Sequence, residues 1–452
     1  MDLSRFTTHS LQTYPKADSV QRILAAALEA VEPAAAVRRC MQRQGDRLVV
    51  ADRAYDLNRI RRVYIAGAGK AGYPMAREAA RLVADKLNSG ILVVKEGYSG
   101  EVPGITLRQA GHPLPDERGV RATHEIINLL REAGEDDLVI CLISGGGSAL
   151  LTAPATGLQL ADLQELTHLL LACGANIGEI NTLRKHLDEI KGGRLTRHAY
   201  PAQLVTLILS DVIGDPLEAI ASGPTVADPT TYQDAIRVLE RYGIRERTPP
   251  AILAYLQRGQ VGEVPETPKP GEPGLEGSQN VVIANNLCAA EAALEQARKV
   301  GFNTLLLSTT LQGEARQAGR YLAGVTRQVA VNGGLIPRPA CLVAGGETTV
   351  TLRGDGLGGR NQEVALGAVA GLDGLEGALL VTLATDGGDG PTDAAGAVVT
   401  GETSQRAQRA GMDALDILNR NDAYHFFEPL GDLLITGPTL TNVNDLAFIF
   451  VI

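Results

Sequence analysis

The chain has 452 residues, of which 44% are hydrophobic and 21% charged, which is typical of a globular protein with two or three domains. Its net charge of −10 argues against a nucleic-acid partner, because such a protein needs a basic face. Five scattered cysteines without a Cys-x-x-Cys pair predict neither a disulfide framework nor a zinc site. The N-terminus lacks the apolar segment of a signal peptide, and no apolar run approaches the ~18 residues of a membrane span. We therefore expect a cytoplasmic protein with no membrane partner.

The first glycine-rich loop follows a short apolar strand in the segment Arg61–Gly72, Arg-Arg-Val-Tyr-Ile-Ala-Gly-Ala-Gly-Lys-Ala-Gly. Its glycines satisfy the G-x-G-x-x-G pattern of a dinucleotide-binding unit, with Gly67 and Gly69 as the first two. Lys70 lies inside the loop, where its ammonium would be a point charge for a phosphoryl group. A solvated surface lysine is the alternative. A Walker A loop is excluded, because Ala71 stands where Ser or Thr is needed.

The second glycine-rich loop follows the apolar run Leu138–Ile143, which predicts a strand buried on both faces. Three glycines there are free to adopt positive φ, and their N–H groups would face an anion at the start of the next helix. We therefore predict a phosphate site made of Ser144, Gly145, Gly146, Gly147 and Ser148. A tight turn that binds nothing is the alternative.

A basic segment and a carboxylate follow this loop. The helical pattern of residues 181–195 carries Arg184 and His186, for which a solvated helix face is the better interpretation. Lys191 is different, because Gly192 and Gly193 end the helix beside it, and we predict that it contacts a phosphate or carboxylate. Asp211 stands at the end of the next buried strand, a place typical of metal-binding or acid/base carboxylates.

The second half of the chain carries two further candidate groups. Arg360 lies near the first turn of a helix that follows a glycine loop, an arrangement that suits an oxyanion. Asp386, Asp389 and Asp393 follow the buried strand 379–385 at a spacing that suits Mg²⁺, with Asx-turn chemistry as the alternative.

The apolar patterning predicts an α/β protein with an N-terminal domain at residues 1–258 and a C-terminal domain at 281–452. Prolines and glycines within 259–280 indicate a linker or an exposed hairpin between them. Residues 281–307 read as a compact βαβ unit. The last apolar strand, residues 446–452, could pack back on the N-terminal domain.

These parts favour phosphoryl transfer to a small molecule, because that reaction needs positioning, metal and cations rather than a protein nucleophile. The NAD(P)-dependent reduction of hydroxypyruvate is the main alternative, suggested by the G-x-G-x-x-G pattern and Glu96. A sensor that binds a phosphorylated metabolite without turnover is a third possibility.

Several motifs resemble the class II glycerate 2-kinases, whose C-terminal part is called the MOFRL domain. They include Ile143-Ser-Gly-Gly-Gly-Ser-Ala-Leu-Leu, Gly358-Gly-Arg-Asn-Gln-Glu, Thr385-Asp-Gly-Gly-Asp-Gly-Pro-Thr-Asp and Thr436-Gly-Pro-Thr-Leu-Thr-Asn-Val-Asn-Asp. The resemblance implies phosphorylation of D-glycerate at the 2-hydroxyl by ATP and a divalent metal, giving 2-phosphoglycerate and ADP. It also implies two Rossmann-like three-layer α/β/α domains with the active site in the cleft between them.

By this resemblance, Lys70 and Arg360 match the family's catalytic positions. To these we add Asp211 as a further catalytic candidate, the two glycine loops and Lys191 as ATP-binding groups, and Asp386 and Asp389 as ligands of Mg²⁺. Which carboxylate is the base is left open, as is a homo-oligomeric state. One departure stands out: Leu440 occupies a position where a small residue, often glycine, is expected.

Overall fold

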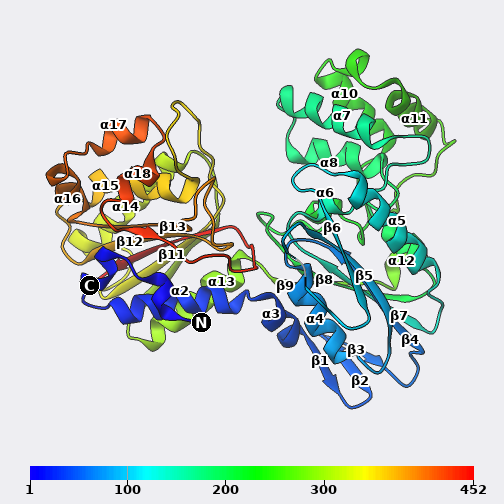
Figure 1. Cartoon of the computed structure of the whole chain (residues 1–452), viewed down its shortest axis with the longest axis horizontal. Helices are drawn as coiled ribbons and strands as arrows, with labels where there is room; N and C mark the ends of the chain where they lie inside the picture. Colours follow the sequence, from blue (N-terminus) through cyan, green and yellow to red (C-terminus); the bar gives the residue numbers. More distant parts are fainter. Residues whose placement is uncertain (99) are drawn as a thin grey trace. The chain divides into compact units, whose positions relative to one another are not determined.

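The computed structural model describes residues 1–98 and 100–452, apart from the side chain of Asn332. The chain forms two compact units, each with its own sheet (Figure 1). Unit 1 consists of residues 1–35 and 284–452, and unit 2 of residues 36–283. Among the described residues, no helix is both long and apolar enough to cross a membrane.

Unit 2 is built on a six-stranded sheet with the strand order β6-β5-β4-β7-β8-β9. The strands are β4 (Arg62–Ala68), β5 (Leu87–Lys95), β6 (Ile105–Ala110), β7 (Asp137–Ile143), β8 (Gln203–Leu209) and β9 (Gln279–Ala284). The first five pair in parallel, and the sequence of strands is that of a Rossmann sheet, whose order reverses between β4 and β7. Helices α4 (Gly72–Leu82) and α5 (Glu117–Arg131) pack on this sheet, and short α9 (Arg194–Ala199) packs against β8.

Four further helices of unit 2 form a cluster with a core of its own. They are α7 (Leu160–Ala172), α8 (Ile177–His186), α10 (Tyr232–Arg241) and α11 (Pro250–Gln260), packed around Leu166, Leu170, Ile180, Leu183 and Tyr232. Figure 1 shows this cluster at the end of the sheet where the single-turn helix α6 (Gly147–Leu150) follows β7. The helical cluster therefore covers the carboxyl end of the parallel strands, where such sheets bind their ligands.

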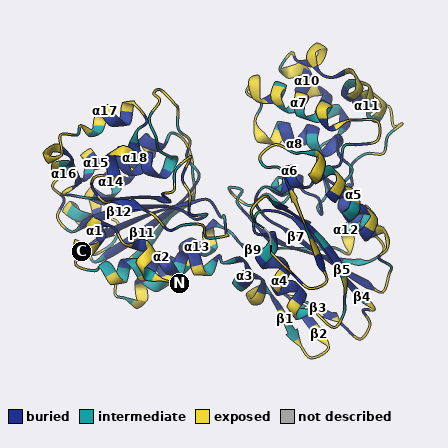
Figure 2. Cartoon of the chain, viewed as in Figure 1, coloured by how far each residue is buried: buried dark blue, intermediate teal, exposed yellow. Residues whose placement is uncertain are grey.

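Unit 1 has a mixed six-stranded sheet with the order β10-β11-β15-β12-β13-β14. The strands are β10 (Asn303–Leu311), β11 (Ala340–Gly346), β12 (Ala378–Ala384), β13 (Gly396–Thr400), β14 (Leu433–Leu434) and β15 (Asp445–Val451). Helices α14 (Ala315–Asn332) and α15 (Arg360–Leu372) cover one face, and α13 (Asn286–Lys299) with α2 (Ala17–Ala30) covers the other. Figure 2 shows that the central strands of both sheets are buried. The predicted α/β class with two three-layer domains is confirmed.

The smaller elements lie at the margins of the units. Unit 2 also has a three-stranded antiparallel sheet, β1 (Met41–Gln44), β2 (Arg47–Val50) and β3 (Arg53–Asp56), together with α12 (Pro273–Glu276) and 3₁₀ turns at Ile220–Ser222 and Arg245–Arg247. Unit 1 has a 3₁₀ turn at Leu3–Phe6 and helices α1 (His9–Thr13), α16 (Thr403–Arg409), α17 (Ala414–Asn419) and α18 (Ala423–Phe427). Helix α3 (Pro33–Cys40) spans the boundary between residues 35 and 36.

The start of the predicted N-terminal domain is wrong, because residues 1–35 belong to unit 1. The apolar face of α2, including Val20, Ile23 and Leu24, is buried, and this helix packs on α13. The Tyr14 hydroxyl also donates a hydrogen bond of 2.9 Å to the carbonyl of Gly377. The amphipathic pattern of α2 indicates a buried face but does not indicate the partner that buries it.

The predicted linker at 259–280 is an integral part of unit 2. Thr267 is buried and donates to Asp228 Oδ2 at 3.0 Å, and Glu266 Oε1 lies 2.9 Å from His186 Nε2. This segment is therefore held in unit 2 by buried hydrogen bonds rather than by apolar contacts. A segment held in this way has a polar composition, and that composition led to the prediction that it is exposed.

Two strands near the predicted boundary also differ from expectation. β9 lies at the edge of the unit 2 sheet and β10 lies in the unit 1 sheet, so the predicted βαβ unit at 281–307 does not form. β15 does not pack on the N-terminal domain, because it lies between β11 and β12, antiparallel to both. All seven residues of β15 are buried, which only a central strand allows.

Asp137, the first residue of β7, provides a test of how unit 2 is held together. Burial alone would raise the pKa of Asp137, but hydrogen bonds from Arg62 (2.7 Å), the Gly134 N–H (2.8 Å) and Arg61 hold that pKa at about 2. The resulting stability is complete above the ordinary pKa of 3.8 and is lost as the pH falls toward 2.

We therefore expect Asp137→Asn to lower the free energy of unfolding at pH 7 by about 2 kcal/mol. The variant should also lose less stability than the wild type between pH 4 and pH 2. Urea unfolding at several pH values measures both effects, and parallel pH profiles for the two proteins would contradict the assignment.

Candidate functional site

The two glycine-rich loops meet at the carboxyl ends of β4 and β7, where the strand order of the unit 2 sheet reverses. The Lys70 N–H donates to the Gly145 carbonyl at 2.9 Å. The Ser144 N–H donates to the Ala68 carbonyl at 3.1 Å, and the Ala71 N–H donates to Ser144 Oγ at 3.0 Å. These bonds join the loops into one structure at the place where open α/β sheets bind ligands.

Gly67 and Gly69 make this junction possible. A Cβ atom on Gly67 would lie 1.9 Å from the Leu142 carbonyl oxygen, and one on Gly69 would lie 2.0 Å from Ser144 Oγ. Both glycines also have positive φ, at 149° and 142°. The packing of the two loops therefore accounts for these glycines and for the position of Ser144, and their predicted contact with a nucleotide stays a prediction.

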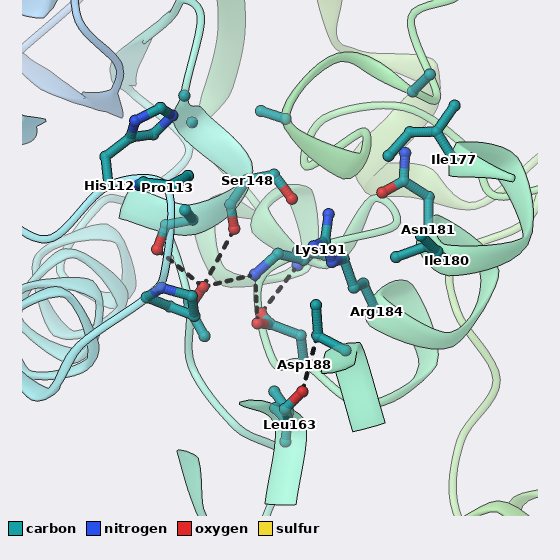
Figure 3. A pocket seen from close by; sticks show the side chains of 18 of the residues that line it. His112, Pro113, Ser148, Leu163, Ile177, Ile180, Asn181, Arg184, Asp188 and Lys191 are labelled. Carbon is teal, nitrogen blue, oxygen red and sulfur yellow. Dashed lines mark hydrogen bonds and ion pairs between the residues drawn. The ribbon is translucent and has the colours of Figure 1, made fainter. Parts of the chain in front are cut away.

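A cavity of about 360 Å³ opens beside the second loop, lined by that loop and by residues of α7 and α8 (Figure 3). The structure brings Asp211 to this loop, since a Cβ atom on Gly145 would lie 2.1 Å from Asp211 Oδ2. The Ser148 hydroxyl, which lines the cavity, lies 2.8 Å from the Ser222 hydroxyl. Two of the predicted groups, the loop Ser144–Ser148 and Asp211, thus lie in one pocket.

His112 lines the same pocket and was missed in the sequence. Its ring covers Gly146, where an added Cβ atom would lie 2.9 Å from His112 Cδ2. Burial lowers the pKa of His112 to about 4, and the nearby ammonium groups of Lys70 and Lys95 act in the same direction. The imidazole is therefore uncharged at neutral pH. Its place two residues after β6, at the carboxyl end of a parallel strand, is the signal that could have found it.

Lys191 is not placed as predicted. Its buried ammonium donates to Asp188 Oδ2 (2.5 Å, Figure 3), the Leu151 carbonyl (2.7 Å) and Thr152 Oγ1 (3.1 Å). Burial lowers the pKa of Lys191. Since all three N–H bonds are directed at protein oxygens, Lys191 has none left for a phosphate or carboxylate. The geometry gives it a structural role instead.

Arg184, rather than Lys191, is the cation of this segment that is available to an anionic ligand. Its half-buried guanidinium lines the pocket, and the described residues offer it no hydrogen-bond or ion-pair partner. Burial lowers the pKa of Arg184, with no carboxylate to oppose it. The expected solvated helix face is therefore wrong for Arg184. Helical spacing was the missed signal, because Arg184 lies three and four residues after Asn181 and Ile180, which line the same pocket.

Arg360 lies in unit 1 as the first residue of α15. Its Nε donates to Asp445 Oδ2 at 2.6 Å, Nη2 lies 3.3 Å from Asp445 Oδ1, and Nη1 is bonded to Glu347. Burial alone would lower the pKa of Arg360, but the two carboxylates hold it above its usual value. Burial also raises the pKa of Asp445 to about 6. The guanidinium thus stands at the helix start as predicted, paired with two carboxylates, while its meeting with Lys70 of unit 2 stays a prediction.

The predicted Mg²⁺ cluster is not formed by the three aspartates of the loop after β12. Buried Asp389 accepts the Asn361 N–H at 3.1 Å and the Gln362 N–H at 2.9 Å, so it caps the start of α15. Asp393 accepts the Tyr424 hydroxyl, and Asp386 accepts the Gly388 N–H in an Asx turn. Within residues 1–98 and 100–452, no three His, Cys, Asp or Glu side chains are arranged to hold a metal. The metal role predicted for Asp389 therefore does not fit its surroundings.

The backbone conformation at Leu440 accounts for the glycine that the family pattern leads us to expect there. Its φ is +63°, a left-handed conformation that glycine adopts without cost and leucine does not. The loop before β15 keeps the backbone shape of a glycine-containing loop despite the larger residue.

Two family models match the chain. Residues 19–257 match a domain of unknown function, DUF4147, and residues 340–445 match the MOFRL family. A glycerate 2-kinase of Pyrococcus horikoshii is 42% identical over 95% of this chain and 96% of its own length. A D-glycerate 2-kinase of Thermotoga maritima is 41% identical over 85% of this chain and 89% of its own. The chain belongs to the class II glycerate 2-kinase family.

Solved structures agree with this family. A crystal structure of a Pyrococcus horikoshii protein has a TM-score of 0.85 and 42% identity, covering 96% of this chain and 98% of that one. The Thermotoga maritima glycerate kinase has a TM-score of 0.86 and 39% identity, covering 95% and 98%. An Agrobacterium vitis protein with the provisional name of hydroxypyruvate reductase is also 43% identical, over 86% of this chain and 99% of its own. The predicted resemblance is confirmed.

The two roles considered for Lys191 predict different results for Lys191→Met. Because the substitution leaves the Asp188 carboxylate buried without its cation, we expect the free energy of unfolding to fall by about 3–5 kcal/mol. The double variant Lys191→Met/Asp188→Asn removes the unpaired charge and should recover part of that loss. Urea unfolding measures both variants. Wild-type stability combined with weakened nucleotide binding would restore the predicted ligand role.

Proposed function

We propose that this chain transfers the terminal phosphoryl group of ATP to the 2-hydroxyl of D-glycerate, giving 2-phosphoglycerate and ADP. The observation that carries the proposal is the 42% identity to a glycerate 2-kinase over 95% of the chain. The pocket beside the loop Ser144–Ser148 supports it, because a glycine-rich loop, a carboxylate and an unpaired guanidinium line one cavity. These groups suit a reaction that depends on positioning and on cations.

Within the pocket, we assign the backbone of the loop Ser144–Ser148 to the phosphates of ATP. Asp211, against Gly145, is placed to accept the proton of the attacking 2-hydroxyl. Neutral His112 covers the loop on another side and helps to exclude water from it. The proton transfer and the phosphate contacts would then occur on one rigid junction between β4 and β7.

Two cations are assigned to the charge on the transferred phosphoryl group. The ammonium of Lys70 makes no hydrogen bond or ion pair with the residues that the structure describes, so it is available to a ligand. The guanidinium of Arg360 is held in orientation by Asp445 and would contribute planar, paired donors. Stabilisation of charge on the equatorial oxygens is the main requirement of this chemistry.

Mg²⁺ would neutralise charge on the phosphates of ATP when bound. Such ions take one or two protein carboxylates together with phosphate oxygens and water. We assign this contact to Asp386, whose half-buried carboxylate accepts only the Gly388 N–H among the hydrogen bonds of the described residues. Asp389 is left out, because α15 uses both its oxygens.

Reduction of hydroxypyruvate is the second candidate, favoured by the Agrobacterium vitis relative and by the G-x-G-x-x-G pattern. The pattern has a different explanation here, since Gly67 and Gly69 leave room for the neighbouring loop. The kinase reading is therefore the better supported one.

Product analysis separates the two candidates. With ATP, Mg²⁺ and D-glycerate, the purified chain should release ADP, and NMR should identify 2-phosphoglycerate rather than 3-phosphoglycerate. Omission of the metal should abolish the reaction. Oxidation of NADH by hydroxypyruvate, without release of ADP from ATP and glycerate, would establish the reductase instead.

Lys70→Met should lower kcat by about a hundredfold to a thousandfold, because a charge that stabilises the transition state is lost. Its melting temperature should stay close to that of the wild type, since the ammonium has no partner among the described residues. Arg360→Lys, which keeps a charge for Asp445, should show a comparable loss of kcat. Lys299→Met, at an exposed lysine paired with Glu295, is the matched control. Near-wild-type turnover in either variant would remove that residue from the catalytic set.

A further inference from the structure

The pocket beside the loop Ser144–Ser148 has an apolar wall that D-glycerate does not explain. We call the residues Leu163 and Thr167 of α7 and Ile177 and Ile180 of α8 the α7–α8 wall. Ile177 is 63% exposed, whereas Ile180, one turn later on the same helix, belongs to the buried core of the helical cluster. D-Glycerate carries a carboxylate and two hydroxyls on three carbons, so it has little apolar surface to cover this wall. The cavity, at about 360 Å³, is instead in the range of larger ligands.

A cation lines the same cavity as this wall and the glycine loop. Arg184 lies one helical turn after Ile180 on α8, and its guanidinium has no partner among the described residues. In a partly buried pocket, such a group favours an anion that accepts two parallel hydrogen bonds. Lys191 does not compete for that anion, because its ammonium is bonded to Asp188, Leu151 and Thr152.

Asn181, next to Arg184 on the same helix face, is held in a defined orientation. Its Oδ1 accepts the Ser222 hydroxyl at 3.1 Å, and Ser222 lies 2.8 Å from the Ser148 hydroxyl of the glycine loop. These two hydrogen bonds connect α8 to the glycine loop. Asn181 is almost fully buried but lines the cavity, and its amide nitrogen has no acceptor among the residues that the structure describes (Figure 3). It is thus a second donor beside the guanidinium.

We propose that this pocket binds a nucleoside polyphosphate, with the base on the α7–α8 wall and the phosphates between Arg184, Asn181 and the glycine loop. The combination of features favours a nucleotide, because an apolar surface, the two donors Arg184 and Asn181 and a glycine-rich loop line one cavity. A purine base presents two apolar faces followed by a chain of anionic groups. The inference rests on the proposed function, which makes ATP the phosphoryl donor, and it assigns new residues to the recognition of that donor.

The proposal divides nucleotide binding into two parts that respond to different substitutions. Arg184→Gln removes the charge and should weaken the binding of both ADP and inorganic tripolyphosphate about tenfold to a hundredfold. Ile177→Asp places a charge on the wall and should weaken ADP about tenfold while leaving tripolyphosphate unchanged. Arg184→Lys keeps the charge without the planar fork, so its effect on both ligands should be intermediate.

Isothermal titration calorimetry with ADP, tripolyphosphate and D-glycerate measures these effects on the full chain. Leu171→Asp is the matched control for the wall, because Leu171 is an equally exposed apolar residue of α7, at 59%, that does not line the pocket. It should bind all three ligands as the wild type does. Melting temperatures of all variants show whether each one is folded.

Three outcomes decide the matter. Weaker binding of D-glycerate to Arg184→Gln, with ADP unaffected, would assign the pocket to the acid and overturn the proposal. Equal losses of ADP and tripolyphosphate in Ile177→Asp would show that the wall holds no base, and would also overturn it. If the expected pattern of nucleotide binding is found but no 2-phosphoglycerate is formed, the proposed function fails and the nucleotide site stands.

Discussion

The candidate site of unit 2 is built on the contact between the two glycine-rich loops. β4 and β7 are adjacent parallel strands, so the loops that follow them begin side by side, separated only by the spacing between neighbouring strands. At that separation, a Cβ atom on Gly67 or Gly69 would overlap the neighbouring strand or loop. Because glycine has no Cβ atom, the two loops come close enough to form backbone hydrogen bonds. Lys70, the loop Ser144–Ser148 and Asp211 are positioned by this contact, and the pocket follows from it.

Partners decide which of the basic residues are available to a ligand. Lys191, His186 and Arg360 each have a carboxylate within hydrogen-bond distance, whereas Lys70 and Arg184 have no partner among the described residues. A buried ion pair stabilises the fold only while both members stay together, so Lys191, whose three N–H bonds all end on protein oxygens, can bind a ligand only at the expense of its carboxylate. Arg360 uses three of its five N–H bonds on Asp445 and Glu347, so its pairing leaves two for a ligand. The spacing of residues in the sequence does not show which basic side chains have a carboxylate partner. The partner of Arg360, the first residue of α15, is for example Asp445, the first residue of β15.

The local elements were predictable, and their partners were not. The apolar runs that predicted strands at 138–143, 204–210 and 379–385 correspond to β7, β8 and β12, because burial on both faces leaves a continuous apolar pattern. The same patterns gave α2, β9 and β15 the wrong neighbours, since an apolar face indicates burial but not which surface covers it. The candidate site followed the same rule. Asp211 was predicted at the end of a buried strand, where β8 ends, but its contact with Gly145 was not predicted, and neither was the position of Asp389 at the N-terminus of α15.

The same loop geometry would serve a reductase or a kinase, so the distinction must come from charge. Hydride transfer from a nicotinamide develops negative charge on a single carbonyl oxygen, whereas phosphoryl transfer develops it on three oxygens. Lys70, in the first glycine loop, and Arg184, in the pocket beside the second, both lack a carboxylate partner among the described residues. A half-buried guanidinium without a counter-ion is costly unless an anion binds there, because burial disfavours its charged form. That cost is understandable in a protein whose ligand brings the missing negative charge, and the phosphates of a nucleotide do so.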